Sequence, residues 1–104
     1  TGAREEAARL CDRVLQRDDR CVQAWVLRGA LAHDGGDLAG AERHLRRALA
    51  IDPQSALALT NLGLVHVAQG DPVRAGAAFE AALARDPNNI DALNNLGNVW
   101  KQAK

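Results

Sequence analysis

The chain has 104 residues, with 13 basic and 13 acidic side chains and three aromatic residues. This length allows one small domain. The balanced charge and the few aromatic rings argue against a nucleic-acid-binding protein, which typically carries a basic surface with interleaved aromatic side chains. Charged residues interrupt the apolar stretches every few positions, so we predict no insertion into a membrane.

A period of 34 residues runs through the chain. Gly29, Gly63 and Gly97 are separated by this distance, and so are Pro53 and Pro87. Self-similarity at a fixed period of this length is typical of repeat proteins, in which each unit packs mainly against its neighbours.

In chain order, the period predicts half a repeat at residues 1–21, full repeats at 22–55 and 56–89, and half a repeat at 90–104. Within each full repeat, apolar residues recur at helical spacing in two stretches, which indicates two amphipathic helices. The first half repeat matches a second helix and the last matches a first helix. The predicted fold is therefore all-α, with six helices in antiparallel pairs, and we expect it to be a piece of a longer array without a capping helix.

The two helices of each full repeat are separated by a turn with recognisable end signals. Gly36 and Gly70 suit a left-handed conformation that ends a helix. Asp37 and Asp71 can cap the helix that follows, and Pro72 stands in its first turn, where no hydrogen bond is lost. An Asp-Pro pair then ends the second helix of each full repeat.

Small residues predict close packing between the paired helices. The glycines of the 34-residue period are expected to face Ala41, Ala75 and their equivalents, so that the two helices approach closely. The larger Leu45 and Phe79 are expected to fill the space beside them. Because one helix pair cannot bury both of its faces, stacked pairs are needed for stability.

These positions resemble the tetratricopeptide repeat (TPR) family, whose pattern is Trp-x2-Leu-Gly-x2-Tyr, Ala-x3-Phe, Ala and Pro. The second full repeat carries Leu59, Leu62, Gly63, His66, Ala75, Phe79, Ala82 and Pro87 at these positions, and the first carries Trp25, Arg28, Gly29, Ala32, Ala41, Leu45, Ala48 and Pro53. Arg28 departs from the expected Leu, and Ala32 and His66 depart from the expected Tyr. The resemblance covers essentially the whole chain and implies a right-handed superhelical α-solenoid.

In that family the first helix of each repeat lines a concave groove that holds a peptide or a partner helix. The resemblance therefore implies a protein or peptide ligand and a scaffold function without catalysis. The residues expected to line the groove are Gln23, Val26, Ala30 and His33, then Thr60, Asn61 and Leu64, then Asn94, Asn95, Asn98 and Lys101.

Asn61 and Asn95 precede the Leu-Gly pair at the same repeat position. A side-chain amide offers a donor and an acceptor, so it can hold a peptide backbone without reading the ligand's side chains. This arrangement resembles the asparagine ladder in the TPR domain of O-linked N-acetylglucosamine transferases, although the first full repeat has Leu27 there. The alternative is that both amides form hydrogen bonds within or between the helices.

A different TPR site, found in some cochaperones, binds a C-terminal carboxylate through Lys and Asn. The corresponding residues here are Val26, Ala30, Asn61, Asp91 and Asn95, of which only Asn61 matches. We therefore do not predict a receptor for Hsp70 or Hsp90 tails.

Two alternatives to groove binding are open. The uncapped ends of the array suggest a homo-oligomer that stacks through exposed stripes, with Leu93, Leu96 and Trp100 at the C-terminal end. The chain is also consistent with a substrate-docking arm of a larger enzyme such as a glycosyltransferase.

No catalytic constellation is found in the sequence. His33, His44 and His66 lack a neighbouring nucleophile or paired carboxylates, and His66 is expected to pack in the core or at its edge. Cys11 and Cys21 are ten residues apart and form no Cys-x-x-Cys motif. We expect free, partly buried thiols, no metal site and no cofactor, in a setting that fits the cell interior without requiring it.

Overall fold

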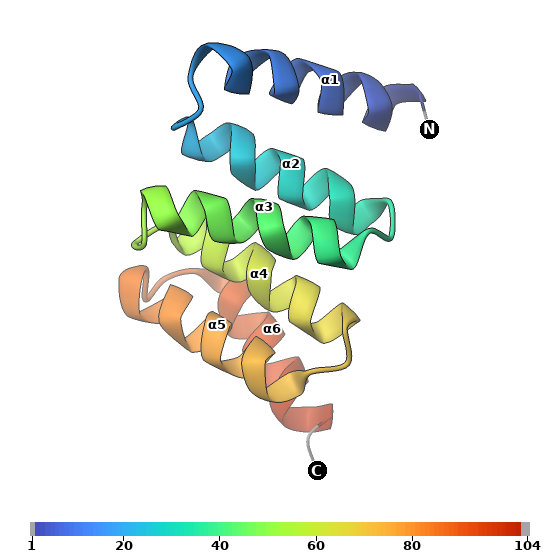
Figure 1. Ribbon diagram of the computed structural model, residues 1–104. Helices are drawn as coiled ribbons and strands as arrows, with labels where there is room; N and C mark the ends of the chain where they lie inside the picture. The colour runs from blue at the N-terminus through green and yellow to red at the C-terminus, as the bar shows by residue number, and fades with distance from the viewer. Residues whose placement is uncertain (1, 103–104) are drawn as a thin grey trace. The chain divides into compact units, whose positions relative to one another are not determined.

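The structure, a computed structural model, describes residues 2–102, which form six α-helices and no strands (Figure 1). The helices are α1 (Gly2–Arg17), α2 (Val22–Asp34), α3 (Leu38–Ile51), α4 (Ala56–Ala68), α5 (Pro72–Arg85) and α6 (Ile90–Gln102). The all-α fold with six helices is confirmed for these residues. None of the helices in the described part is long and apolar enough to cross a membrane.

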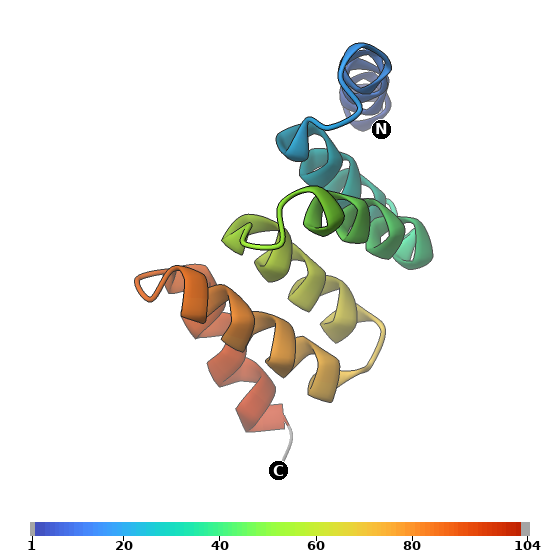
Figure 2. The ribbon, with the colours of Figure 1, turned by 60° about the vertical axis from the view of Figure 1, so that its left-hand side comes forward.

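The contacts within the chain divide it into two compact units, Thr1–Pro53 and Gln54–Lys104. In the first unit α2 packs against both α1 and α3. In the second unit α4 packs against α5, and α6 contacts both of them. Figure 2 shows α4 and α5 running antiparallel, joined by a short turn.

The predicted turn signals form as expected. Gly36 and Gly70 have φ angles of 85° and 77°, which is the left-handed region that glycine adopts without steric cost. Asp37 and Asp71 each accept a hydrogen bond from the backbone N–H three residues later, at 2.9 and 3.1 Å. Pro72 is the first residue of α5. The glycines thus follow the first helices, α2 and α4, and the aspartate caps fix the starts of the second helices, α3 and α5.

Two of the three periodic glycines allow close helix contact. A Cβ added to Gly29 would lie 2.7 Å from Cγ of Leu45, and one added to Gly63 would lie 2.7 Å from Cδ1 and Cζ of Phe79. Gly97 differs from the prediction, because a Cβ there would meet no atom within 4 Å among the described residues. The face of α6 that carries Gly97 therefore has no helix packed on it within residues 2–102.

The core of the second unit lies between its three helices. Its buried residues are Ala75, Phe79 and Ala82 of α5 and Ala92, Leu96 and Val99 of α6. Ala56, Leu59 and Leu64 of α4 pack against them. Phe79 is fully buried, so it provides the largest single contribution of apolar surface to this core.

A smaller cluster of rings joins α2 and α3 in the first unit. The His44 ring stacks on the Trp25 indole with the centroids 5.9 Å apart, and the Arg47 guanidinium lies 5.7 Å from the same indole. The indole Nε1 donates a hydrogen bond to the backbone carbonyl of Asp19 at 2.8 Å. Trp25 thereby connects α2 to the turn before it and to α3 beside it.

Candidate functional site

Asn61 and Asn95 lie on α4 and α6, two helices of the second unit that contact one another. Both residues are half-buried. Within residues 2–102, neither side-chain amide takes part in a hydrogen bond, whereas nearby Thr60 and Asn89 are both engaged. Both amides therefore keep a donor and an acceptor for a ligand.

Asn89 couples the two helices that carry these asparagines. Its Oδ1 accepts a hydrogen bond from the backbone N–H of Ala92 at 3.0 Å, which caps the start of α6. Its Nδ2 donates to the Thr60 hydroxyl at 3.3 Å, and that hydroxyl donates to the carbonyl of Ala56 at 2.8 Å. One side chain thus caps α6 and connects it to α4 one residue before Asn61.

This role of Asn89 was not predicted from the sequence. Its position directly before an amphipathic helix is the cap signal that could have found it. The bond to Thr60 has no local sequence signal, because the two residues are 29 positions apart.

The predicted groove residues differ in exposure. Val26 and Thr60 are buried, at 4% and 6%. Half-buried positions are Ala30, His33, Asn61, Leu64 and Asn95, and exposed positions are Gln23, Asn94, Asn98 and Lys101. On α6 the amides therefore form an exposed polar strip, while Thr60 is already occupied by hydrogen bonds within the second unit.

The part of the predicted groove in the first unit lies on α2. Gln23 accepts a weak hydrogen bond from the Cys21 thiol, with 3.8 Å between Sγ and Oε1. His33 Nδ1 lies 3.6 Å from a carboxylate oxygen of Asp34. Val26 is buried, whereas Leu27 beside it is exposed, so this helix offers an apolar side chain between the polar groups of Gln23 and His33.

The predicted C-terminal stripe requires one correction. Leu93 and Trp100 are 53% and 57% exposed, but Leu96 is only 3% exposed. Leu96 packs in the core of the second unit with Phe79 and its neighbours. The exposed surface at this end is therefore formed around Leu93, Gly97 and Trp100.

An apolar groove between α1 and α2 was not located from the sequence, although an exposed stripe on the first helix was expected. It has a volume of about 330 Å³ and is lined by Ala7, Leu10, Cys11, Val14, Cys21, Gln23, Ala24 and Leu27. Its α1 residues stand at i, i+3, i+4 and i+7, which is the sequence signal that could have found it. Burial raises the pKa of the Cys11 thiol, so this group is protonated and weakly nucleophilic at neutral pH.

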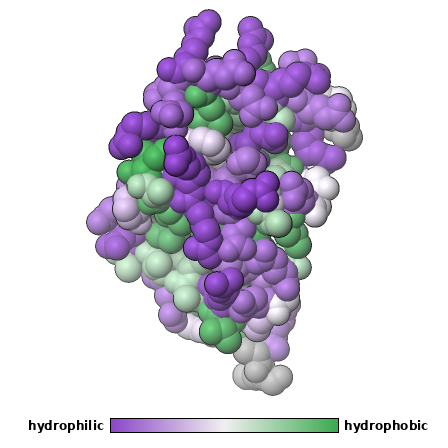
Figure 3. Space-filling model, in the orientation of Figure 1, coloured by the Kyte–Doolittle hydropathy of each residue, from purple (hydrophilic) through white to green (hydrophobic). Residues whose placement is uncertain are grey.

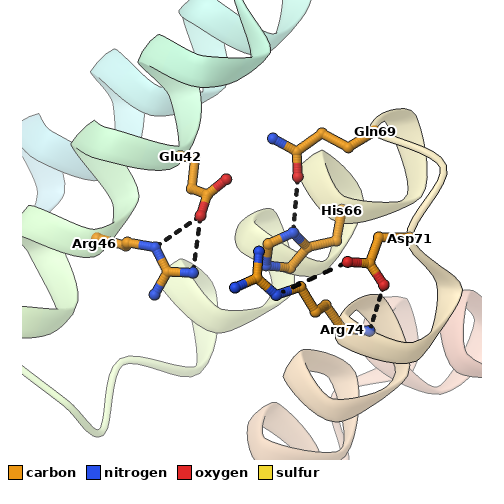
Figure 4. Close-up of polar contacts among 6 residues, drawn as sticks. All are labelled: Glu42, Arg46, His66, Gln69, Asp71 and Arg74. Carbon is orange, nitrogen blue, oxygen red and sulfur yellow. Dashed lines mark hydrogen bonds and ion pairs between the residues drawn. The ribbon is translucent and has the colours of Figure 1, made fainter.

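Several charged and polar groups outside these surfaces pair with residues close to them in the sequence. Arg46 pairs with Glu42 on α3 at 2.8 Å, and Arg74 pairs with Asp71 at 3.8 Å (Figure 4). His66 is 3% exposed and its Nδ1 lies 2.9 Å from Oε1 of Gln69, which confirms the expected core histidine. In the described residues no group of three or more His, Cys, Asp or Glu side chains is placed to hold a metal ion.

A tetratricopeptide repeat family profile matches residues 2–56, 39–90 and 60–104. "FK506-binding protein-like" from Rattus norvegicus is 42% identical over 72 residues, which is 69% of this chain and 20% of that protein. "Probable biofilm formation methyltransferase WspC" from Pseudomonas putida is 37% identical over 70 residues, 67% of this chain and 16% of that protein. The chain thus spans about a fifth of the curated relatives it matches.

Similar solved structures have the same fold. The first TPR of Spaghetti (RPAP3) bound to an HSP90 peptide has a TM-score of 0.92 at 22% identity, covering 98% of this chain and 81% of that one. An O-GlcNAc transferase from Thermobaculum terrenum has a TM-score of 0.85 at 36% identity, covering 88% of this chain and 18% of that one. With its 34-residue period, paired helices and family match over essentially its whole length, the chain belongs to the tetratricopeptide repeat family.

Proposed function

We propose that this chain is a non-catalytic protein-interaction scaffold that holds an extended peptide through the side-chain amides of Asn61 and Asn95. One observation carries the proposal: two amides at the same repeat position stand on contacting helices, and no described residue occupies their hydrogen-bonding groups. An unpaired amide that is half-buried loses less on binding than one that must first break an internal bond.

The chemistry favours recognition of the peptide backbone. Each residue of an extended peptide offers one N–H and one C=O, which match the acceptor and donor of an asparagine side chain. Each such hydrogen bond contributes about 0.5–1.5 kcal/mol net. Two asparagines therefore give weak binding with little preference for the sequence of the peptide. The exposed amides of Asn94 and Asn98 extend the polar strip on α6.

The similar TPR structures support a peptide ligand in general terms. One is bound to an HSP90 peptide and another is a complex with an HSP70 peptide, at 22% and 21% identity to this chain. Asp91 is exposed on the first turn of α6, where it disfavours a carboxylate close to this strip. We therefore propose an internal, extended peptide segment as the ligand instead of an acidic C-terminal tail.

The proposal is tested by selecting peptides from a displayed library of random sequences on immobilised chain. Peptides recovered on the wild type should lose about 5- to 150-fold in affinity for the Asn61→Ala/Asn95→Ala variant, which lacks two hydrogen bonds of this strength. The matched control is Asn88→Ala, which removes an exposed amide from the turn before α6. Equal enrichment on the wild type and the double variant, with both folded by circular dichroism, would contradict the proposal.

A second candidate is a substrate-docking arm of a larger enzyme. It is favoured by the 36% identity to the Thermobaculum terrenum O-GlcNAc transferase, of which the chain covers 18%. Under this alternative, the full-length gene product transfers a group to protein substrates, and deletion of residues 1–104 weakens its use of proteins but not of short peptides. A full-length product without any transferase activity would rule it out.

A further inference from the structure

The first unit has a second groove, which lies over α2 between α1 and α3 and which we call the Trp25 groove. Its volume is about 460 Å³, and it is lined by Asp12, Leu15, Gln16, Asp19, Trp25, Arg28 and His44. Its floor and both walls come from described helices and the turn after α1, so no further helix is needed to form it. In Figure 3 an apolar patch just below α1 is bordered by hydrophilic side chains, and apolar surface with a polar rim is common at protein-interaction sites.

Two polar residues of the Trp25 groove have aliphatic equivalents in the second full repeat. Arg28 and His44 correspond to Leu62 and Ala78, which lie 34 positions later. Leu62 and Ala78 are buried, at 6% and 8% exposure. Aliphatic side chains are therefore sufficient to pack a helix pair at these positions. The polar groups of Arg28 and His44 are not required by packing, which favours a role at the surface of the groove.

The floor of the Trp25 groove is aromatic and uncharged. The indole of Trp25 is half-buried and is held in place by the hydrogen bond that its Nε1 donates to the carbonyl of Asp19 at 2.8 Å. The His44 ring stacks on this indole, and half-buried Leu15 lies in the same lining. Burial and two neighbouring arginines hold the pKa of His44 below 6.5, so its ring is neutral at pH 7. A fixed aromatic surface of this kind suits an apolar side chain of a partner.

The rim that α3 contributes is basic. Arg43 and Arg47 are exposed and stand one helical turn apart. The Arg47 guanidinium lies 5.7 Å from the centroid of the Trp25 ring, and the charge of Arg43 is close enough to lower the pKa of His44. Within residues 2–102 neither arginine forms an ion pair with a carboxylate. Both guanidinium charges are therefore available to attract an acidic side chain.

The opposite rim, formed by α1 and the turn after it, is acidic. Asp12 and Asp19 are both exposed. Asp12 Oδ1 lies 3.1 Å from Nε of Arg28, so these two charges offset one another. The carboxylate of Asp19 has no such partner in the described part of the chain, since only its backbone carbonyl is engaged, by Trp25. The remaining charge on this rim is therefore negative, and it attracts a basic side chain.

We propose that the Trp25 groove binds a segment of a partner protein that presents one apolar side chain between a basic and an acidic side chain. The apolar side chain packs on Trp25, the acidic one pairs with Arg43 or Arg47, and the basic one pairs with Asp19. Opposite charges on the two rims set the direction of the bound segment, because the reversed orientation would bring like charges together. Neither asparagine of the proposed peptide site lines this groove, so the proposal does not rest on peptide binding there.

The test begins with a displayed library of random peptides, selected on the Asn61→Ala/Asn95→Ala variant, which lacks the amide pair. The recovered peptides should bind this variant and the wild type with equal affinity. Adding Trp25→Leu and His44→Ala should weaken them about tenfold or more, because both aromatic rings of the floor are removed. These substitutions introduce the residues that the second full repeat has at the same positions, and circular dichroism checks that the variant is folded.

Charge reversal then identifies the two rims. Asp19→Arg should weaken the recovered peptides about 2- to 5-fold, and replacing their basic residue with Glu should restore the affinity. Arg43→Glu should have an effect of the same size, which replacement of the acidic peptide residue with Lys should reverse. All of these side chains are exposed, so the fold should be unaffected. The matched control is Arg85→Glu, an equal charge change at an exposed position of α5, which should leave binding unchanged.

Three results would overturn the proposal. One is a selection that recovers no binding peptide. Another is binding that is unchanged by Trp25→Leu with His44→Ala, which would place the peptides on a different surface. The third is binding that is lost in that variant but is indifferent to both charge reversals, which would mean that the rims do not select the partner. Because the selection uses a variant without the amide pair, its outcome is independent of whether Asn61 and Asn95 hold a peptide.

Discussion

At the scale of the residue, the periodic glycines have the same position in the repeat but different surroundings. A Cβ added to Gly63 would collide with the ring of Phe79, which is rigid and fully buried. A Cβ added to Gly29 would collide with the side chain of Leu45, which is more flexible. Gly97 has an open face among the described residues. The same substitution should therefore have opposite effects at different positions of one pattern.

The first prediction uses this contrast. Gly63→Ala should lower the free energy of unfolding by about 1–3 kcal/mol, because the methyl group overlaps the Phe79 ring. Gly97→Ala should raise it by about 0.5–1 kcal/mol through helix propensity. Urea unfolding followed by circular dichroism, at concentrations low enough to keep the chain monomeric, measures both. Gly63→Leu should be worse than Gly63→Ala, and an unchanged stability for either Gly63 variant would contradict the close helix contact.

A second prediction concerns pH. Burial, together with the positive charges of Arg28 and Arg43, holds the pKa of His44 below its usual value of 6.5. The unfolded chain therefore binds the proton more readily than the folded chain. The contribution of neutral His44 to stability is fully present above about pH 6.5 and is lost as the pH falls from there through the folded-state pKa.

The measurement is the free energy of unfolding of the wild type and of His44→Phe between pH 7.5 and pH 5. The phenylalanine ring preserves the stack on Trp25 but cannot titrate. The wild type should lose more stability than the variant over this interval. Parallel curves for the two proteins would show that His44 does not have a lowered pKa.

At the scale of the element, helix ends were predictable because their signals are local. The aspartate caps, the left-handed glycines and the proline at the start of α5 each depend on a few adjacent residues. What periodicity could not predict was which helix faces are covered. Leu96 and Gly97 are neighbours in one stripe, yet Leu96 is buried against α5, whereas a Cβ added to Gly97 would meet no atom within 4 Å in residues 2–102. This difference depends on which helices lie around α6.

A third prediction concerns Asn89, whose side chain connects α6 to α4. Asn89→Ala should lower the free energy of unfolding by about 1 kcal/mol through loss of the cap on α6, with a further loss from the bond to Thr60. Asn89→Asp keeps the capping oxygen but has no N–H to donate, so it should restore most of the stability. Urea unfolding of the three proteins decides this. Equal destabilisation by alanine and aspartate would assign the effect to the bond with Thr60 instead of the cap.

The same variants test how the candidate site is positioned. Because Asn89 ties the start of α6 to the residue before Asn61, losing this tie should alter the amide environments of Asn61 and Asn95. Amide chemical shifts of both side chains in the Asn89→Ala variant should differ from the wild type by more than those of Asn88. Unchanged shifts would mean that packing alone sets the spacing of α4 and α6.

At the scale of the whole molecule, the repeat pattern identifies the family, and the scaffold function is our proposal. The same pattern places Asn61 and Asn95 on helices that contact one another. The sequence could not decide between amides that bind a ligand and amides that pair internally. The hydrogen bonds of the second unit favour the first, since Thr60 and Asn89 pair with each other and leave Asn61 and Asn95 unpaired within the described residues. We therefore propose that this chain holds a peptide by its backbone.

The most direct measurement is calorimetric titration of a library-selected peptide whose backbone amides are N-methylated one at a time. Methylation at the residues in register with Asn61 or Asn95 should weaken binding about 2- to 10-fold, while alanine replacement of the peptide side chains has little effect. The methylation effect should disappear in the Asn61→Ala/Asn95→Ala variant, because the two changes remove the same bonds. Two results together would contradict the proposal: truncation of the peptide side chains abolishes binding, and methylation weakens binding equally in the wild type and the double variant. The chain would then recognise the peptide's side chains, and Asn61 and Asn95 would not hold its backbone.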